Sequence, residues 1–254
     1  MTPLERINII RKWILEYVET MDKPANCLVV GISGGVDSAV VSTICAMTGM
    51  KTLVASMPIS QRPEHHDLSI KHKNWITTKY SNCFGVEIDL THTFLSFENQ
   101  MIDMKFKDEM GLANSRARMR MMCLYQLSAS TSGIVVGTGN KIEDFGVGFY
   151  TKYGDGGVDI SPIADCTKTE VWAMAKELGI LEEIQIAEPT DGLWSDGRND
   201  TDQLGMSYSQ IEYLMKNPSE PAYQQYLSIR KKNLHKMKSI PVCKFDGKTN
   251  LAND

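Results

Sequence analysis

Apolar positions along the chain follow two spacings, which predict helices and strands in turn. Near the N-terminus, apolar residues recur at helical spacing and predict an amphipathic helix over residues 3–21. They are Leu4, Ile7, Ile10, Trp13, Ile14, Tyr17, Val18 and Met21. Residues 27–32 then form an uninterrupted apolar run, which is typical of a strand buried on both faces of a parallel sheet.

The alternation of strands and helices continues and predicts a parallel sheet covered by helices. Further strands are expected over residues 52–57, 86–90 and 134–138, and helices over residues 39–47, 64–80, 94–104, 112–130, 169–178, 207–215 and 221–231. Residues 139–158 contain six glycines and predict a loop, and the polar residues 189–204 are a candidate lid. The simplest interpretation is one domain over residues 1–254 with a C-terminal helical tail, residues 207–254.

Composition narrows the possible functions. The net charge of −4 argues against a nucleic-acid-binding protein, because such proteins use basic residues to hold phosphates. Charged residues interrupt the first helix, and the sequence contains no apolar run of about 20 residues, so we expect no membrane span. The six cysteines form no CxxC pair and are expected to be reduced thiols of a cytoplasmic protein.

The segment after the first strand carries the main chemical signal. Residues 31–38 read Gly-Ile-Ser-Gly-Gly-Val-Asp-Ser, between a buried strand and a helix. In an open α/β sheet, ligands bind beyond the carboxyl ends of the strands, and the free amides of a helix N-terminus attract anions. Gly34 and Gly35 let the backbone approach a phosphate closely, while Ser33 and Ser38 add hydroxyl donors.

Asp37 distinguishes this loop from other phosphate loops. Neither GxxxxGK[ST] nor GxGxxG is present. A bare carboxylate would repel phosphates, so Asp37 suggests a cation such as Mg²⁺ between them. Alternatively, Asp37 is an ordinary acid in the first turn of a helix, where the helix dipole stabilises its negative charge.

Residues 33–38 resemble the SGGxDS loop of the ATP pyrophosphatase superfamily, whose members cleave ATP between the α and β phosphates. Later segments resemble the NAD synthetases in order and spacing, most specifically the sequence TKYGDGG at residues 151–157. The resemblance covers about residues 5–240 and implies a Rossmann-like open parallel sheet flanked by helices, of the adenine nucleotide alpha hydrolase-like type. No glutaminase domain precedes these segments, so the resemblance is to the ammonia-dependent form.

The resemblance implies a two-step reaction and a set of site residues. ATP would activate the carboxylate of deamido-NAD as an acyl-adenylate, releasing pyrophosphate, and ammonia would then displace AMP to give NAD. Asp37 and Glu143 would bind Mg²⁺ and, with Lys168, form the catalytic group. The residues expected at ATP are Gly31, Ile32, Ser33, Gly34, Gly35, Val36, Asp37, Ser38, Thr138, Lys168 and Thr190. Those expected at deamido-NAD are Arg118, Lys152, Asp159, His235 and Lys236.

The family forms homodimers with substrate bound across the interface, so the same resemblance implies a homodimer. Helix spacing places Arg116 and Arg120 on one face and Arg118 on another, without deciding which face meets substrate. We expect Met119, Met121 and Met122 to pack in the core. The chain departs from common family members by one additional residue between Glu143 and Thr151, in the sequence after Thr190, and after Lys236, where Met-Lys replaces a run of arginines.

Three alternatives remain. A ligase of the GMP synthetase type would share the loop but would need a different C-terminal segment. A tRNA-modifying member would require a basic surface. A non-catalytic nucleotide-binding protein could keep the glycines but would not need both Asp37 and Glu143.

Overall fold

The computed structural model describes residues 1–60, 63–190, 193, 199–243 and 245. Its centre is a parallel sheet of four strands in the order β3-β2-β1-β4. The strands are β1 (Cys27–Gly31), β2 (Lys51–Ser56), β3 (Cys83–Glu87) and β4 (Gly133–Val135). The order runs outward from β1 to β3 and then returns to the other side of β1. Because the order reverses at β1, the connection that leaves β1 and the connection that leads to β4 cover opposite faces of the sheet. The crevice between them, at the carboxyl end of β1, is where ligands bind in such sheets.

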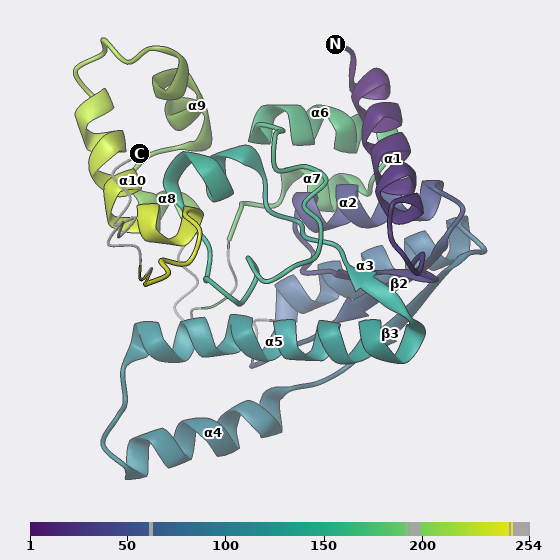
Figure 1. Ribbon diagram of the computed structural model, residues 1–254, viewed down its shortest axis with the longest axis horizontal. Helices are drawn as coiled ribbons and strands as arrows, with labels where there is room; N and C mark the ends of the chain where they lie inside the picture. The colour runs from purple at the N-terminus through teal and green to yellow at the C-terminus, as the bar shows by residue number, and fades with distance from the viewer. Residues whose placement is uncertain (61–62, 191–192, 194–198, 244, 246–254) are drawn as a thin grey trace.

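Helices cover both faces of the sheet (Figure 1). One face is covered by α2 (Val36–Met47) and α3 (Pro63–Lys79), with α1 (Pro3–Glu19) and α6 (Lys168–Leu178) packed on α2. The opposite face is covered by α5 (Glu109–Thr131), and α4 (Thr91–Asp103) lies against α5. The expected fold class, an open parallel sheet flanked by helices, is therefore confirmed.

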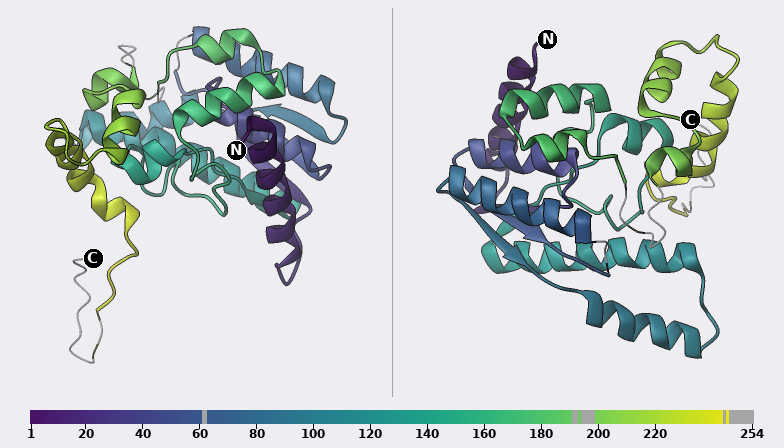
Figure 2. Two further views of the ribbon diagram at one scale, coloured as in Figure 1. Left: turned by 90° about the horizontal axis from the view of Figure 1, so that it is seen from above. Right: turned by 180° about the vertical axis from the view of Figure 1, so that it is seen from behind.

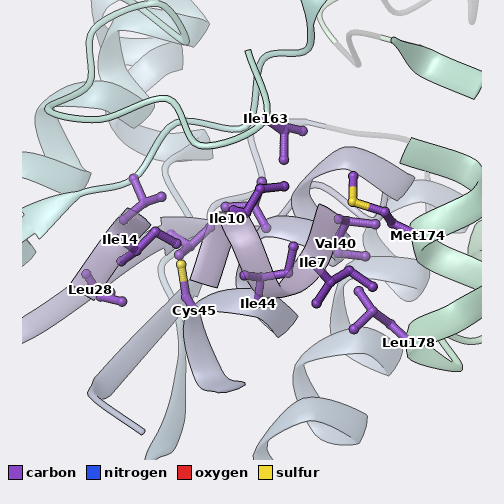
Figure 3. Close-up of a cluster of buried hydrophobic side chains, with 14 of the residues drawn as sticks. Ile7, Ile10, Ile14, Leu28, Val40, Ile44, Cys45, Ile163, Met174 and Leu178 are labelled. Atoms are coloured by element: carbon purple, nitrogen blue, oxygen red, sulfur yellow. The ribbon is translucent and has the colours of Figure 1, made fainter. Parts of the chain in front are cut away.

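Alternate residues of β1 pack into different layers of the core. Leu28 and Val30 join the cluster formed with α1, α2 and α6, and Figure 3 shows Leu28 there beside Ile14 and Ile44. Val29 points to the other face, where Leu124 and Leu127 of α5 cover it. Burial of β1 on both faces explains why its apolar run has no polar alternation.

A second core forms at the end of the molecule away from α1 (Figures 1 and 2). It joins a π-helix, η1 (Ile142–Val147), to α8 (Asp200–Leu204), α9 (Tyr208–Lys216) and α10 (Tyr223–Met237). Its buried apolar members are Ile142, Val147, Leu204, Met206, Tyr208, Ile211, Leu214 and Tyr226. The remaining short helix, α7 (Glu182–Ile186), follows α6.

Several sequence-based expectations differ from the structure. The strand expected over residues 86–90 lies at Cys83–Glu87, and the helix expected over residues 221–231 spans Tyr223–Met237. The strand expected over residues 134–138 ends at Val135, after which Val136 makes a single bridge to Ile160 and the chain leaves the sheet. Residues 142–147, expected as loop, form a π-helix, whose turn takes up one more residue than an α turn. Met122 is 58% exposed, so its expected core position is wrong, since that face of α5 looks outward.

Two other expectations can be compared with the described residues. All six cysteines are free and four of them are buried, as a set of reduced thiols requires. Among the described residues, no helix is long and apolar enough to cross a membrane. The candidate lid over residues 189–204 lies partly outside the described residues.

A buried histidine predicts how stability depends on pH. His72 of α3 bonds Ser42 at 2.8 Å, and burial lowers its pKa to about 4 from an ordinary 6.5. Because the unfolded chain binds this proton more readily, stability is lost as pH falls from 6.5 toward 4. Between pH 7 and pH 5, the wild type should lose about 2 kcal/mol more unfolding free energy than His72→Gln, which keeps a partner for Ser42 but cannot titrate.

Urea unfolding at the two pH values measures this difference. His92→Gln, at an exposed position of α4, is the control and should keep the wild-type pH dependence. Equal losses in the wild type and His72→Gln would contradict a buried neutral His72.

Candidate functional site

The loop between β1 and α2 is closed by its own serines: the Ser33 amide donates to Ser38 Oγ and the Gly35 amide to Ser33 Oγ, each at 3.2 Å. Ser33 and Ser38 hydroxyls lie 3.2 Å apart, and the Ser38 hydroxyl donates to the Gly35 carbonyl at 3.0 Å. Gly34 adopts φ +88°, a left-handed conformation that favours glycine. The N-cap of α2 is Gly35, which has no side chain to cap the first turn, so the amides there remain available to an anion.

Lys168 links the loop to the π-helix. Its ammonium donates to Asp37 Oδ2 at 2.5 Å and to Glu143 Oε1 at 3.1 Å. The Lys168 side chain is only 3% exposed, so both contacts are largely shielded from water. Thr167 and Glu170 form a capping box that starts α6 at Lys168, which fixes where this side chain leaves the backbone.

The charge of Lys168 is stabilised by its partners. Burial alone would lower the pKa of the ammonium, but the carboxylates of Asp37 and Glu143 outweigh burial and raise this pKa above its ordinary value. Lys168 is therefore a cation at any physiological pH. A permanent positive charge beside a helix N-terminus suits the binding of an anionic group such as a phosphate.

Asn140 fixes the positions of Asp37 and Glu143 relative to each other. It is fully buried, and its amide nitrogen donates to Asp37 Oδ1 at 3.0 Å. Its amide oxygen accepts the backbone N–H groups of Ile142 and Glu143 at 3.0 and 3.1 Å. One side chain thus fixes both the first turn of α2 and the start of η1. Although Asn140 stands in the segment that resembles the NAD synthetases, it was not among the expected site residues.

A cavity of about 260 Å³ opens beside this cluster at the carboxyl ends of the strands. Every residue expected at ATP contributes to its lining: residues 31–38, Thr138, Lys168 and Thr190. Glu143 lines it as well. The structure therefore brings together segments that are more than 150 residues apart in the sequence.

The residues expected at deamido-NAD lie outside the lining of this cavity. Three of them form a chain of contacts: Arg118 Nε donates to the Lys152 carbonyl at 3.3 Å, and Lys152 Nζ to the His235 carbonyl at 3.3 Å. Lys236 donates to the carbonyls of Gly148 and Tyr150, and burial lowers its pKa. The side chains of Arg118, Lys152 and Lys236 and the carbonyl of His235 make these contacts where α10 meets the segment after η1.

Asp159 is set apart from those four residues. Its carboxylate accepts the Val135 amide at 2.7 Å and the Tyr125 hydroxyl at 3.0 Å, which places it at the end of β4. In this position Asp159 completes the hydrogen bonding of the short strand β4.

Several cavity residues were missed by sequence reasoning. Asp144 and Asp155 both line the cavity, and burial, followed by the neighbouring charge of Glu143, raises the pKa of Asp144 to about 8. Arg120 lines it too, and its Nε donates to the Met57 carbonyl at 3.0 Å. The face of α5 that carries Arg116 and Arg120 is therefore turned toward the cavity. The helical spacing had placed these two residues on one face of the helix but could not tell whether that face meets the cavity.

The donor set fits a divalent cation together with a substrate phosphate. Among the described residues, no group of three or more His, Cys, Asp or Glu side chains is arranged to hold a metal alone. However, Asp37 and Glu143 converge on one cationic nitrogen, so their oxygens can face a common positive charge. Mg²⁺ commonly takes one or two carboxylates and completes its shell with phosphate oxygens and water.

The fold and the cavity define an α/β protein of the adenine nucleotide alpha hydrolase-like class. A family model described as NAD synthase matches residues 6–250. The NH(3)-dependent NAD(+) synthetase of Carboxydothermus hydrogenoformans is 35% identical over 240 residues, covering 93% of this chain and 96% of that protein. The corresponding enzyme of Methanosarcina acetivorans is 34% identical over 251 residues, covering 90% and 95%. The chain belongs to the NAD synthase family.

Solved structures show the same fold. The NMN synthetase of Francisella tularensis superposes with a TM-score of 0.86 at 27% identity, covering 96% of this chain and all of that one. The NH3-dependent NAD synthetase of Campylobacter jejuni superposes with a TM-score of 0.78 at 24% identity, with the same coverage.

Removal of the Lys168 charge should destabilise the protein. In Lys168→Met, Asp37 and Glu143 face each other without their shared cation, and breaking a buried ion pair in this way costs about 3–5 kcal/mol. Urea unfolding in the presence of a chelator measures the loss. Lys141→Met is the matched control, because Lys141 pairs with Asp165, whose side chain is 96% exposed, and such a pair contributes less than about 1 kcal/mol. Equal losses in the two variants would contradict the bridging role.

Proposed function

We propose that this chain is an ammonia-dependent ligase that uses ATP to convert deamido-NAD into NAD, releasing AMP and pyrophosphate. The observation that carries the proposal is the meeting of the 33–38 loop with Lys168, Asp37 and Glu143 in one cavity. Family membership supports it, because the named relatives that cover nearly the whole chain are NH(3)-dependent NAD(+) synthetases.

The cavity suits the first step, attack of a carboxylate on the α-phosphorus of ATP. The bond to the β-phosphate breaks, and negative charge grows on the departing pyrophosphate. The amides at the start of α2 and the permanent charge of Lys168 stabilise that charge from fixed positions. The residues proposed to hold ATP are residues 31–38, Thr138, Lys168 and Thr190, all of which line the cavity.

Asp37 and Glu143 are the proposed ligands of Mg²⁺. When bound, the ion neutralises charge on the phosphates that leave. The protein's own contribution is the placement of the two acids: Lys168 bonds both carboxylates, and Asn140 bonds the Asp37 carboxylate and the backbone amide of Glu143. This arrangement keeps both acids oriented toward the cavity before any substrate arrives.

In the second step, ammonia attacks the acyl carbon, AMP leaves, and a proton is released from nitrogen. The cavity holds an acid proposed to receive that proton, Asp155. Arg118, Lys152, Asp159, His235 and Lys236 are proposed to contact deamido-NAD. Arg118, Lys152 and Lys236 supply positive charge around residues 148–152, which suits the diphosphate of a dinucleotide.

We also propose a homodimer and a cytoplasmic location. The far end of α4 and the start of α5 expose apolar side chains, including those of Ile102, Met104, Phe106 and Met110. Apolar groups gathered in this way are typical of an interface between subunits. The free cysteines fit a reducing compartment.

A second candidate substrate is nicotinate mononucleotide. The observation that favours it is the likeness to an NMN synthetase at a TM-score of 0.86 over 96% of this chain. The chemistry of the cavity is the same for both substrates, because each presents a nicotinate carboxylate. They differ in whether an adenylate half must be accommodated outside the cavity.

Pyrophosphate release separates these possibilities. Purified protein is given ATP, Mg²⁺ and ammonium with deamido-NAD, nicotinate mononucleotide or xanthosine monophosphate. We expect release with deamido-NAD, with NAD and AMP formed in equal amounts. Preference for nicotinate mononucleotide would select the second candidate. Release with xanthosine monophosphate alone would favour a GMP synthetase type, and no release with any acid would contradict a ligase.

Asp37→Asn should lose most of the turnover while keeping the fold. Asparagine keeps the size of the side chain but removes the negative charge that faces Lys168 and the proposed ion. Loss of a single electrostatic contact to the reacting groups commonly lowers kcat about a hundredfold or more. Steady-state kinetics at saturating Mg²⁺ and ATP measure the effect. Asp165→Asn, on an exposed acid, is the matched control, and wild-type kcat in Asp37→Asn would refute the proposed ligand role.

A further inference from the structure

Helix α9 presents two polar side chains, one turn apart, to the proposed cation site. Tyr208 is 4% exposed and Glu212 is 9% exposed, although both carry polar groups. Residues four apart on a helix lie on the same face. Buried polar groups need partners, and both of these find them in segments that carry site residues.

Tyr208 contacts the acidic side of the site. Its hydroxyl lies 2.6 Å from Glu143 Oε1 and 2.7 Å from Asp200 Oδ2, and its ring lies under the Lys168 ammonium, 4.6 Å from it. A hydroxyl has one proton, so Tyr208 donates to one carboxylate at a time. Tyr208 does not line the cavity, but its partners Glu143, Lys168 and Asp200 do, so any effect on substrate must pass through one of these three residues.

Glu212 contacts the basic side. Its carboxylate accepts the Thr169 backbone amide at 3.0 Å and the Thr169 hydroxyl at 2.9 Å. Thr169 directly follows Lys168 at the start of α6, so these bonds fix the turn from which the ammonium extends. A carboxylate near a helix N-terminus is also favoured by the helix dipole.

Packing in the second core explains how α9 can contact both the element that carries Glu143 and the helix that carries Lys168. Ile211 and Leu214 of α9 are buried with Ile142 and Val147 of η1, the element that carries Glu143. The same helix is therefore packed on η1 and bonded to α6. Asp200 extends the contact further, because its amide donates at 3.0 Å to the carbonyl of Pro189, which lines the cavity.

We infer that Tyr208 and Glu212 are positioning residues, which together set the distance between Glu143 and Lys168 and thereby the affinity for a divalent cation with nucleotide. The inference rests on the proposed function for its catalytic meaning, but the cation affinity that it concerns can be measured without turnover. Partners that orient metal ligands commonly contribute about ten- to hundredfold to metal affinity.

The test is Mn²⁺ binding in the presence of an ATP analogue with a methylene bridge between the α and β phosphates, followed by electron paramagnetic resonance. Tyr208→Phe removes the hydroxyl and keeps the ring over Lys168. We expect its Mn²⁺ affinity to fall about ten- to hundredfold. Tyr213→Phe is the matched control, because Tyr213 lies on the same helix, is exposed, and donates its hydroxyl to Glu220, away from the site. Its Mn²⁺ affinity should equal that of the wild type.

Glu212 gives a second, independent variant. Glu212→Ala removes both bonds to Thr169, so the affinity for the ATP analogue should fall about tenfold, while Glu212→Gln, which retains one acceptor oxygen, should be intermediate. Partial recovery of the affinity for the ATP analogue in Glu212→Gln would show that the hydrogen bonds to Thr169 matter, and not only the volume of the side chain. If Tyr208→Phe does not fold, this series alone decides the inference.

Unchanged Mn²⁺ affinity in folded Tyr208→Phe, or unchanged nucleotide affinity in Glu212→Ala, would overturn the inference. A lower melting temperature without a change in either affinity would also overturn it, because it would mean a structural role only. If the wild type binds Mn²⁺ with the analogue but amidates no substrate, the proposed function fails while the positioning inference stands.

Discussion

One buried contact organises this molecule: the ammonium of Lys168 held between the carboxylates of Asp37 and Glu143. Each of the three residues comes from a different part of the chain, at the starts of α2, η1 and α6. Because an ion pair shielded from water tolerates little displacement, these three starts must meet within a few ångströms. The cavity that receives the proposed substrates follows from that meeting, since residues from all three segments line it.

The surrounding structure serves to hold this contact in place. Asn140 fixes the acids relative to each other, and the capping box at Thr167 fixes the start of α6. The second core of η1 and the C-terminal helices adds support from the far side through Tyr208 and Glu212. A site assembled from helix starts in this way is rigid before substrate binds, which is what electrostatic stabilisation of a leaving group requires.

Much of this arrangement could be predicted from the sequence. The apolar run of β1 and the glycine-rich loop after it predicted the sheet and the turn that lines the cavity, because both depend on local residues. The pairing of Asp37 with Glu143 came from a family resemblance. Tyr208 and Asp200 gave no local signal: Tyr208 occupies an ordinary apolar position of an amphipathic helix, and Asp200 lies among the polar residues 189–204, which were interpreted as a candidate lid. Their importance depends on packing between α8, α9 and η1, and such long-range contacts leave no periodic trace in a sequence.

The account is tested most directly by a crystal structure of the protein soaked with Mn²⁺ and a non-cleavable ATP analogue, with anomalous scattering used to locate the ion. The account predicts one Mn²⁺ bound directly by carboxylate oxygens of Asp37 and Glu143, with the analogue's phosphates against the amides of residues 33–38. An ion bound by neither carboxylate, or a nucleotide lying away from that loop, would contradict it.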